Sequence, residues 1–199
     1  RHLMLPCGQP LTFLSSGQLV KNKNFLHPKR CLDSFVLIYV LKGTLNIAQY
    51  GIQYELGPTQ FILLHADTEH YGWQESYEYL HYYWVHFHIP VSPVYISQEQ
   101  YPTDISQALP EKYIVPETGT LTHVKRVPVL FSQLLDISMR RYPASEYLLH
   151  YSLTGLLLEL AGEFSSQLLD PKEDPLHIYK IQDWIRRNFQ QSLTVGQIA

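Results

Sequence analysis

The sequence predicts an α+β protein, in which an antiparallel β-barrel of the jelly-roll type is followed by an antiparallel pair of helices. Two observations predict this order. Residues 11–98 contain short apolar runs separated by turn residues about every eight to twelve positions, which is typical of small barrels and sandwiches. From Leu121 onward, apolar residues recur with the 3.6-residue period of a helix. With 199 residues, 45% of them hydrophobic, the chain can bury a core for both parts.

Tight turns divide the first half into strands. The segment FVLIYVL is almost continuously apolar and is followed by the turn Lys42-Gly43. Tyr50-Gly51 and Gly57-Pro58 supply the next two turns. The expected strands are Leu11–Val20, Phe35–Leu41, Thr44–Gln49, Ile52–Leu56, Thr59–Leu64 and Tyr79–Ile89. Residues 97–116, which contain three prolines, are expected to form a connector.

Two helices are predicted after the connector. The first ends near Arg140-Arg141, and Pro143 suits the first turn of the second, which runs to about Leu169. The apolar stripe of the second helix is wider than one packing partner normally covers. Part of the stripe is therefore expected to pair with a second copy of the chain in a homodimer. The alternative is packing against the barrel. The candidate dimerisation residues are Leu153, Leu156, Leu157 and Leu160.

The last thirty residues predict a linker and the start of another domain. Asp170–Pro175 (DPKEDP) is charged and bounded by proline. Residues 178–185 then repeat apolar side chains at helical spacing, and Ser192 or Thr194 is suited to cap a further helix. That helix has only about one turn before Ala199 and cannot bury its apolar side. We therefore expect the chain to be a fragment of a longer protein.

Composition excludes several classes of function. A formal charge of −3 argues against nucleic-acid binding by this fragment itself, because phosphate neutralisation favours a basic surface. Cys7 and Cys31 are too few for a disulfide framework, which favours a reducing cytoplasm. No apolar run approaches the roughly 20 residues of a membrane span, and the start of the chain lacks a signal peptide. We therefore expect no membrane partner.

Five segments carry a family resemblance. The segments Ile178–Phe189 (IYKIQDWIRRNF) and Leu193–Ala199 (LTVGQIA) resemble the start of the DNA-binding region of AraC-family transcriptional regulators. Leu37–Gly43 (LIYVLKG) and Trp84–Phe87 (WVHF) resemble two strands of the family's sensor domain. The segment Leu56–His70 resembles its loop motif. There, Thr59-Gln60 stands where the family often has Gly-Asp, and His65 stands where it often has Pro.

The resemblance implies both a domain layout and a function. The layout is a cupin-like effector-binding barrel with an N-terminal arm at 1–116, dimerisation helices at 117–169, a linker at 170–176 and a truncated helix-turn-helix start at 177–199. The implied function is effector sensing and dimerisation in a cytoplasmic bacterial regulator that responds to a sugar or glycoside. DNA would be contacted only through the C-terminal domain that follows this fragment. No catalytic residue and no cofactor are expected.

The strand Tyr79–Ile89 gives the main site prediction. Because side chains alternate across a strand, Tyr82, Trp84 and His86 share one face. The resemblance places Trp84 where the arabinose-responsive member of the family stacks its sugar, so this face is expected to line the cavity. Tyr82 and His86 are then candidate hydrogen-bonding neighbours. The flat indole suits the C–H face of a pyranose.

The other predicted ligand-binding residues come from outside this strand. The resemblance implies that His70 ends the loop motif and approaches the same cavity, and that Tyr71 and Trp73 form its wall. It also implies a cation before the FVLIYVL strand that reaches ligand hydroxyls or carboxylates. Arg30 is the candidate, because a guanidinium offers several donors in a fixed fork.

Two alternatives remain open. In a metal-dependent cupin enzyme, such as a sugar isomerase or dioxygenase, His86-x-His88 with Glu69 and His70 would supply ligands. However, the usual cupin His-x-His follows an early glycine turn, and the turn at Gly43 is followed by TLNIAQ, so we predict no metal site. The other alternative is a barrel that serves only as a scaffold, with Trp84 as a core plug and no effector.

Overall fold

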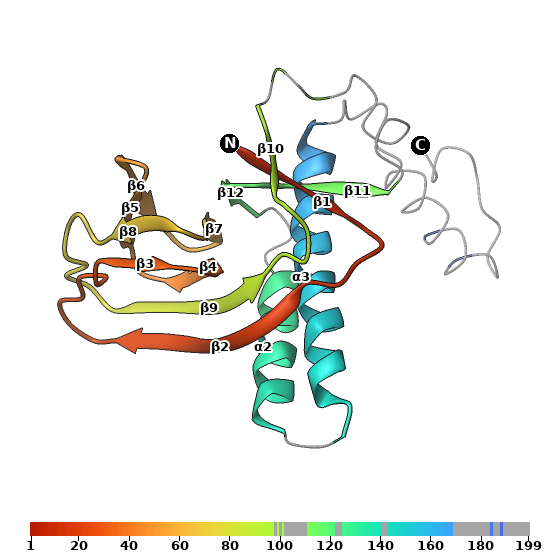
Figure 1. Cartoon of the computed structure of the whole chain (residues 1–199). Coiled ribbons are helices and arrows are strands. Elements are labelled where there is room, and N and C mark those ends of the chain that lie inside the picture. Colours follow the sequence, from red (N-terminus) through yellow and green to blue (C-terminus); the bar gives the residue numbers. More distant parts are fainter. Residues whose placement is uncertain are drawn as a thin grey trace. The chain divides into compact units, whose positions relative to one another are not determined.

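The computed structural model describes residues 1–97, 99, 101, 111–121, 125–140, 143–168, 184 and 188. The chain divides into two compact units, Arg1–Phe164 and Ser165–Ala199. The predicted linker at 170–176 lies outside the described residues, as does the predicted helix-turn-helix start at 177–199 apart from Trp184 and Asn188. The first unit contains the sheets and most of both helices, so the predicted α+β class is confirmed (Figure 1).

Two antiparallel sheets form the cupin-like barrel. The five-stranded sheet has the order β12-β7-β4-β9-β2, and the four-stranded sheet has the order β3-β8-β5-β6. Figure 1 shows β2, β9 and β4 running as neighbours. The strands are β2 (Thr12–Lys21), β3 (Arg30–Leu32), β4 (Phe35–Lys42), β5 (Leu45–Gln49), β6 (Ile52–Leu56), β7 (Gln60–Leu64), β8 (Thr68–Tyr71), β9 (Leu80–His88) and β12 (Thr118–Thr120).

A third, three-stranded sheet corrects the prediction for residues 97–116. Here β1 (His2–Pro6) pairs with β10 (Val94–Ile96) on one side and with β11 (Lys112–Pro116) on the other. The predicted connector thus ends in a strand. Its prolines misled the prediction, because Pro116 occupies the last position of β11 and proline is tolerated at strand ends. The barrel also extends past residue 116, since β12 pairs with β7.

Two apolar cores explain the continuous hydrophobicity of β4. Val36, Ile38 and Val40 face the barrel interior, where they join the core formed by β5, β7 and β9. Leu37 and Tyr39 face the opposite side and join the core that contains the helices. A strand buried on both faces needs apolar residues at every position. The run FVLIYVL therefore marks the centre of the five-stranded sheet.

The two helices cover the outer face of that sheet. They are α2 (Arg126–Met139) and α3 (Ser145–Leu168), which agree closely with the predicted helices at their C-terminal ends. Phe131 of α2 stacks on Tyr83, with ring centroids 5.4 Å apart, and on Tyr39, at 6.2 Å. The Arg126 side chain bridges to Glu159 of α3 with an Nε–Oε1 distance of 2.8 Å.

The burial of four leucines in α3 corrects the prediction that they form a dimer interface. Leu153, Leu156 and Leu157 are 0% exposed and Leu160 is 1% exposed, and all four belong to the core between the helices and the sheet. These side chains pack within their own chain, which was the alternative left open. Helical periodicity identifies an apolar stripe but not the surface that covers it. Among the side chains of α3 that the structure describes, the large hydrophobic ones that are exposed are Tyr147, Leu148, Tyr151 and Leu158.

The loop that departs from the family pattern has its own hydrogen bonds. Thr59 adopts the left-handed conformation with φ 69°, a region in which glycine is favoured. The Gly57 N–H donates to Gln60 Oε1 at 2.6 Å, and the Gln60 amide donates to Thr120 Oγ1 at 3.1 Å. Gln60 therefore ties this turn to β12.

Gly43 ends β4 and requires the absence of a side chain. Its φ is 76°, and a Cβ atom would lie 2.1 Å from the carbonyl oxygen of Tyr79. Gly51 has nearly the same φ, 74°, but a Cβ atom there would meet nothing within 4 Å. The two glycines therefore separate the cost of the left-handed backbone from the cost of the clash.

We expect Gly51→Ala to lower the free energy of unfolding by about 1–2 kcal/mol, the usual cost of a left-handed backbone with a side chain. Gly43→Ala should cost clearly more, because the Tyr79 backbone must also move. Urea denaturation of both variants measures the difference. Equal losses would contradict the close approach at Gly43.

Candidate functional site

The barrel contains a cavity of about 350 Å³ whose lining residues come from both of its sheets. Val36, Ile38 and Leu64 form an apolar wall that is continuous with the interior core. Five of the seven residues predicted to bind a ligand line this cavity. They are Arg30 from β3, His70 from β8, and Tyr82, Trp84 and His86 from β9.

Trp84 is positioned by a glycine on the neighbouring strand. Gly17 of β2 is the cross-strand partner of Trp84, and a Cβ atom on Gly17 would lie 2.5 Å from Cζ2 of the indole. The ring therefore lies directly against the β2 backbone. Its other neighbour is His86, in an edge-on arrangement with centroids 5.2 Å apart. Sequence reasoning missed Gly17, for which a lone glycine inside a predicted strand was the only signal.

His27 is a second cavity residue that sequence reasoning missed. Backbone hydrogen bonds hold its segment in place: Phe25 and Ser76 exchange two, and the Gly72 N–H donates to the His27 carbonyl at 2.8 Å. The imidazole is 9% exposed and lies 5.5 Å from the His70 ring. His27 sits in a loop between strands, so no periodic pattern could have identified it.

The three cavity histidines share one hydrogen-bonding arrangement. Nδ1 lies 2.9 Å from the Pro28 carbonyl in His27, 3.4 Å from the Thr68 carbonyl in His70 and 3.2 Å from Ser34 Oγ in His86. A carbonyl can only accept, so Nδ1 carries the proton in the first two rings. Their Nε2 atoms have no protein partner in the described part of the chain and present a lone pair when the ring is neutral.

Burial keeps these imidazoles uncharged near neutral pH. Desolvation, reinforced by the neighbouring His70, lowers the pKa of His27 to about 4. Desolvation also lowers the pKa of His70 and of His86, and the positive charge of Arg30 lowers both further. Burial raises the pKa of Tyr82, so its hydroxyl stays protonated and can both donate and accept. The cavity thus offers neutral hydrogen-bonding groups.

Tyr71 and Trp73 depart from the prediction, because neither lines the cavity. Along β8 the side chains alternate, so His70 facing inward turns Tyr71 outward. There Tyr71 and Lys29 line an adjoining surface depression, which shares only His27 and Pro28 with the cavity. Trp73 lies beyond the strand and donates its indole N–H to the Tyr54 carbonyl at 3.0 Å. The two aromatic residues contribute to the outside of the four-stranded sheet.

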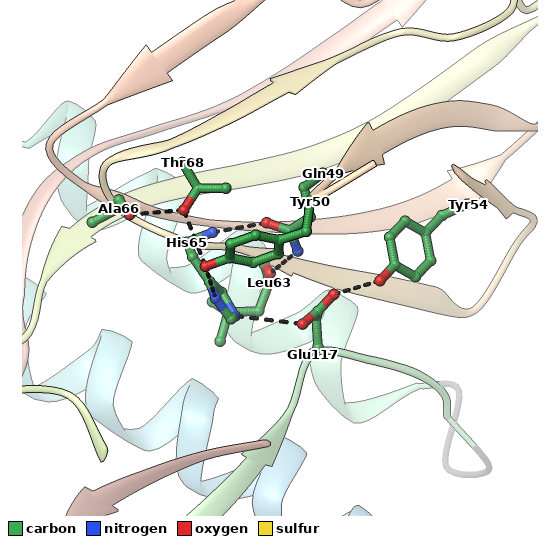
Figure 2. A network of polar contacts seen from close by, with 8 residues as sticks. All are labelled: Gln49, Tyr50, Tyr54, Leu63, His65, Ala66, Thr68 and Glu117. Atoms are coloured by element: carbon green, nitrogen blue, oxygen red, sulfur yellow. Dashed lines mark hydrogen bonds and ion pairs between the residues drawn. The ribbon is translucent and has the colours of Figure 1, made fainter. Parts of the chain in front are cut away.

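A partly buried polar network surrounds His65 (Figure 2). His65 is 2% exposed, and its backbone N–H donates to Gln49 Oε1 at 3.1 Å, a bond that the proline common in the family could not make. The Tyr50 hydroxyl accepts a hydrogen bond from the Thr68 hydroxyl and lies 3.0 Å from His65 Nδ1. When Tyr50 donates to Nδ1, the single N–H of the neutral His65 ring is on Nε2, which faces Glu117. Tyr54 donates to the same carboxylate.

This network joins β5, β6 and β7 to the segment between β11 and β12. Burial lowers the pKa of His65, so the ring is neutral and the Glu117 carboxylate is held mainly by the Tyr54 hydroxyl. The 3.8 Å separation of His65 Nε2 from Glu117 Oε2 is too long for a hydrogen bond. We assign the network a structural role, since it replaces the family's proline with hydrogen bonds between strands.

Among the described residues, no group of three or more His, Cys, Asp or Glu side chains is placed to hold a metal ion. The described helices also include none with the length and hydrophobicity to cross a membrane.

The fold and cavity define a ligand-binding barrel with attached helices. Residues 14–145 match the family described as AraC-like ligand binding domain. The chain belongs to this family, which confirms the resemblance seen in the sequence. It is also 40% identical over 75 residues to the uncharacterized HTH-type transcriptional regulator YisR of Bacillus subtilis strain 168. That alignment covers 38% of this chain and 26% of the relative, so the chain spans about a quarter of it.

Two solved structures show a partial likeness. The cupin domain of Cnp3 from Schizosaccharomyces pombe is 9% identical to this chain. The alignment covers 39% of this chain and 63% of the Cnp3 chain, with a TM-score of 0.33. The EutQ protein of Clostridium difficile is 17% identical to this chain. The alignment covers 38% of this chain and 57% of the EutQ chain, with a TM-score of 0.31.

The lowered histidine pKa values predict a stability that falls in acid. A histidine that stays neutral in the fold but binds a proton when unfolded, near pH 6.5, favours unfolding as the pH drops below that value. For His27 the loss approaches about 1.4 kcal/mol per pH unit between pH 6 and its folded pKa. We expect His27→Gln to make the free energy of unfolding depend less on pH in this range. Chemical denaturation of the parent protein and of this variant from pH 7.5 to 4.5 measures the difference. A His27→Gln curve parallel to that of the parent protein would contradict this assignment.

Proposed function

We propose that this chain is the effector-sensing and dimerisation part of an AraC-family transcriptional regulator, and that a sugar or glycoside binds in the barrel cavity. The observation that carries the proposal is an indole lining the cavity, with uncharged imidazoles lining the same space. A cavity of about 350 Å³ lies in the range used for small ligands. The family match supports a regulator domain, and the choice of a carbohydrate rests on the chemistry of the cavity.

The cavity groups complement the two kinds of surface on a pyranose. The Trp84 ring offers a flat apolar face for the C–H side of the sugar. The free Nε2 lone pairs of His27 and His70 accept hydrogen bonds from hydroxyls, while the Tyr82 hydroxyl can donate or accept. In this proposal the protein binds and releases its effector without a catalytic step or a cofactor.

A ligand on Trp84 would act on the strand that carries Gly17. The start of β2 is held by α3, because the Leu11 N–H donates to Thr154 Oγ1 at 2.9 Å and the Phe13 N–H donates to His150 Nδ1 at 3.0 Å. A ligand that displaces the indole would therefore displace β2 and, through these two hydrogen bonds, α3. The effector signals only if it favours one arrangement of these elements, since equal affinity for two states shifts nothing.

The proposed homodimer uses the exposed face of α3 in place of its buried leucines. Tyr147, Tyr151 and Leu158 recur at spacings of four and seven residues and are 66%, 64% and 39% exposed, so they form one stripe along the helix. Two-fold pairing through this stripe would bring the DNA-binding domains of two regulator copies to neighbouring half-sites in the bacterial cytoplasm.

The ligand prediction is tested by titration calorimetry with mono-, di- and trisaccharides. We expect Trp84→Ala to weaken the best saccharide at least tenfold, about 1.4 kcal/mol, because the stacking surface is lost. Tyr71→Ala is the matched control, since this aromatic residue lies outside the cavity. Unchanged binding by Trp84→Ala, or no binding by any saccharide, would refute the site.

The dimer prediction is tested by light scattering and sedimentation. Tyr151→Glu places a charge in the middle of the exposed stripe, so we expect it to weaken self-association at least tenfold without changing the unfolding midpoint. Ile52→Glu is the control, because Ile52 is 54% exposed on β6 in the barrel. A parent chain that is monomeric at all concentrations, or equal effects of the two variants, would refute the stripe.

A further inference from the structure

We propose that the effector bound in the barrel cavity carries an anionic oxygen group, a carboxylate or a phosphate, and that Arg30 holds this group at the cavity mouth. The inference rests on the proposed function of the cavity and narrows its ligand from carbohydrates in general to acidic or phosphorylated ones.

The cavity lining contains bases and no acids. Its ionisable side chains are Lys21 and Arg30 together with His27, His70, His86 and Tyr82, and no Asp or Glu lines it. Arg30 and Lys21 are both exposed, which places them at the opening. Neither forms an ion pair with a carboxylate in the described part of the chain. Elsewhere on the barrel the neighbouring cation is paired, since Lys29 Nζ lies 2.8 Å from Glu69.

This arrangement leaves positive charge uncompensated beside an apolar wall. Charges of one sign at the mouth of a cleft with low-dielectric walls focus the field on a ligand of the opposite sign. This field extends to the cavity histidines, because the charge of Arg30 lowers the pKa of both His70 and His86. A neutral sugar would leave Lys21 and Arg30 without a counter-charge, and a cationic ligand would be repelled by them. An anion would supply the missing counter-charge.

Arg30 has the geometry for the contact. It is the first residue of β3 and pairs across the sheet with His70, so its side chain stands beside an imidazole that lines the same cavity. A guanidinium binds a carboxylate or a phosphate through two parallel N–H···O bonds. With the anion at Arg30, the rest of the ligand is left to extend toward Trp84.

Binding of an anion should take up protons. Without an anion the three imidazoles are neutral, and the ionisable groups that face them are Lys21 from β2, Arg30 from β3 and Tyr82 from β9. A bound anion favours the protonated imidazole, whose Nε2–H can then donate to it. Affinity for an anionic ligand should therefore rise as the pH falls from 7.5 to 6, whereas affinity for its neutral counterpart should not.

The experiment compares matched pairs of saccharides on the whole chain by calorimetry, using D-galactose with D-galacturonate and D-glucose with D-glucose 6-phosphate. We expect the charged member of at least one pair to bind at least tenfold more tightly than its neutral partner. The preference should shrink as sodium chloride is raised, because salt screens exposed charges. Arg30→Gln should remove the preference. Lys29→Gln, which deletes a paired cation outside the cavity, should keep it. Unfolding midpoints without ligand establish that both variants fold.

Each outcome separates the inference from the function on which it rests. If the neutral saccharide of each pair binds as tightly as the charged one, the cavity is a carbohydrate site and the anion inference is overturned. Equal losses in Arg30→Gln and Lys29→Gln also overturn it. If no saccharide binds, the proposed function fails. The effect of inorganic phosphate on the unfolding midpoint then tests the anion inference by itself. A midpoint raised by phosphate in the parent protein but not in Arg30→Gln supports the anion site, and no rise in the parent overturns it.

Discussion

The alternation of side chains along β9 is the constraint on which the rest of the structure depends. One face of this strand carries Tyr82, Trp84 and His86 to the cavity, and the other carries Tyr83 and Phe87 to the core beneath the helices. Since the period of a strand is two, a shift of one residue would exchange these faces. The register is fixed from both sides by pairing with β2 and β4. The cavity and the helix-packing surface are therefore set by the same hydrogen bonds.

The connection between cavity and helices runs through the edge strand β2. An edge strand has backbone donors with no neighbouring strand to accept them. Near the start of β2, two of these donors are satisfied by side chains of α3, Thr154 and His150. Further along, Gly17 supports the indole that lines the cavity. A change in the position of Trp84 thus acts on a strand whose beginning is fixed to the helix bearing the exposed stripe.

What the sequence could predict follows from how local each signal is. Period-two alternation grouped Tyr82, Trp84 and His86 on one face of a strand. The family resemblance selected that face and supplied Arg30, and all four residues line the cavity. Alternation from His70 would also have excluded Tyr71 from the same wall. The burial of Leu156 was beyond prediction, because an apolar helix face reveals that something covers it but not whether the cover is the same chain. His27 reaches the cavity from a loop whose position is set by backbone bonds distant in sequence.

The charge of the cavity is a property that no single motif carries. Arg30 and Lys21 come from different strands, and each alone has the appearance of an ordinary surface cation. Their combined positive charge matters only because the fold brings both side chains to one opening that has no carboxylate. The cavity imidazoles add no charge of their own, because burial keeps them neutral. The unpaired charges at the mouth would attract an anion, and the groups that it would meet are already in place. Preorganised donors of this kind contribute to affinity without a cost for ordering them. Under the proposal, a receptor built in this way would respond to the charge of its ligand as well as to its shape.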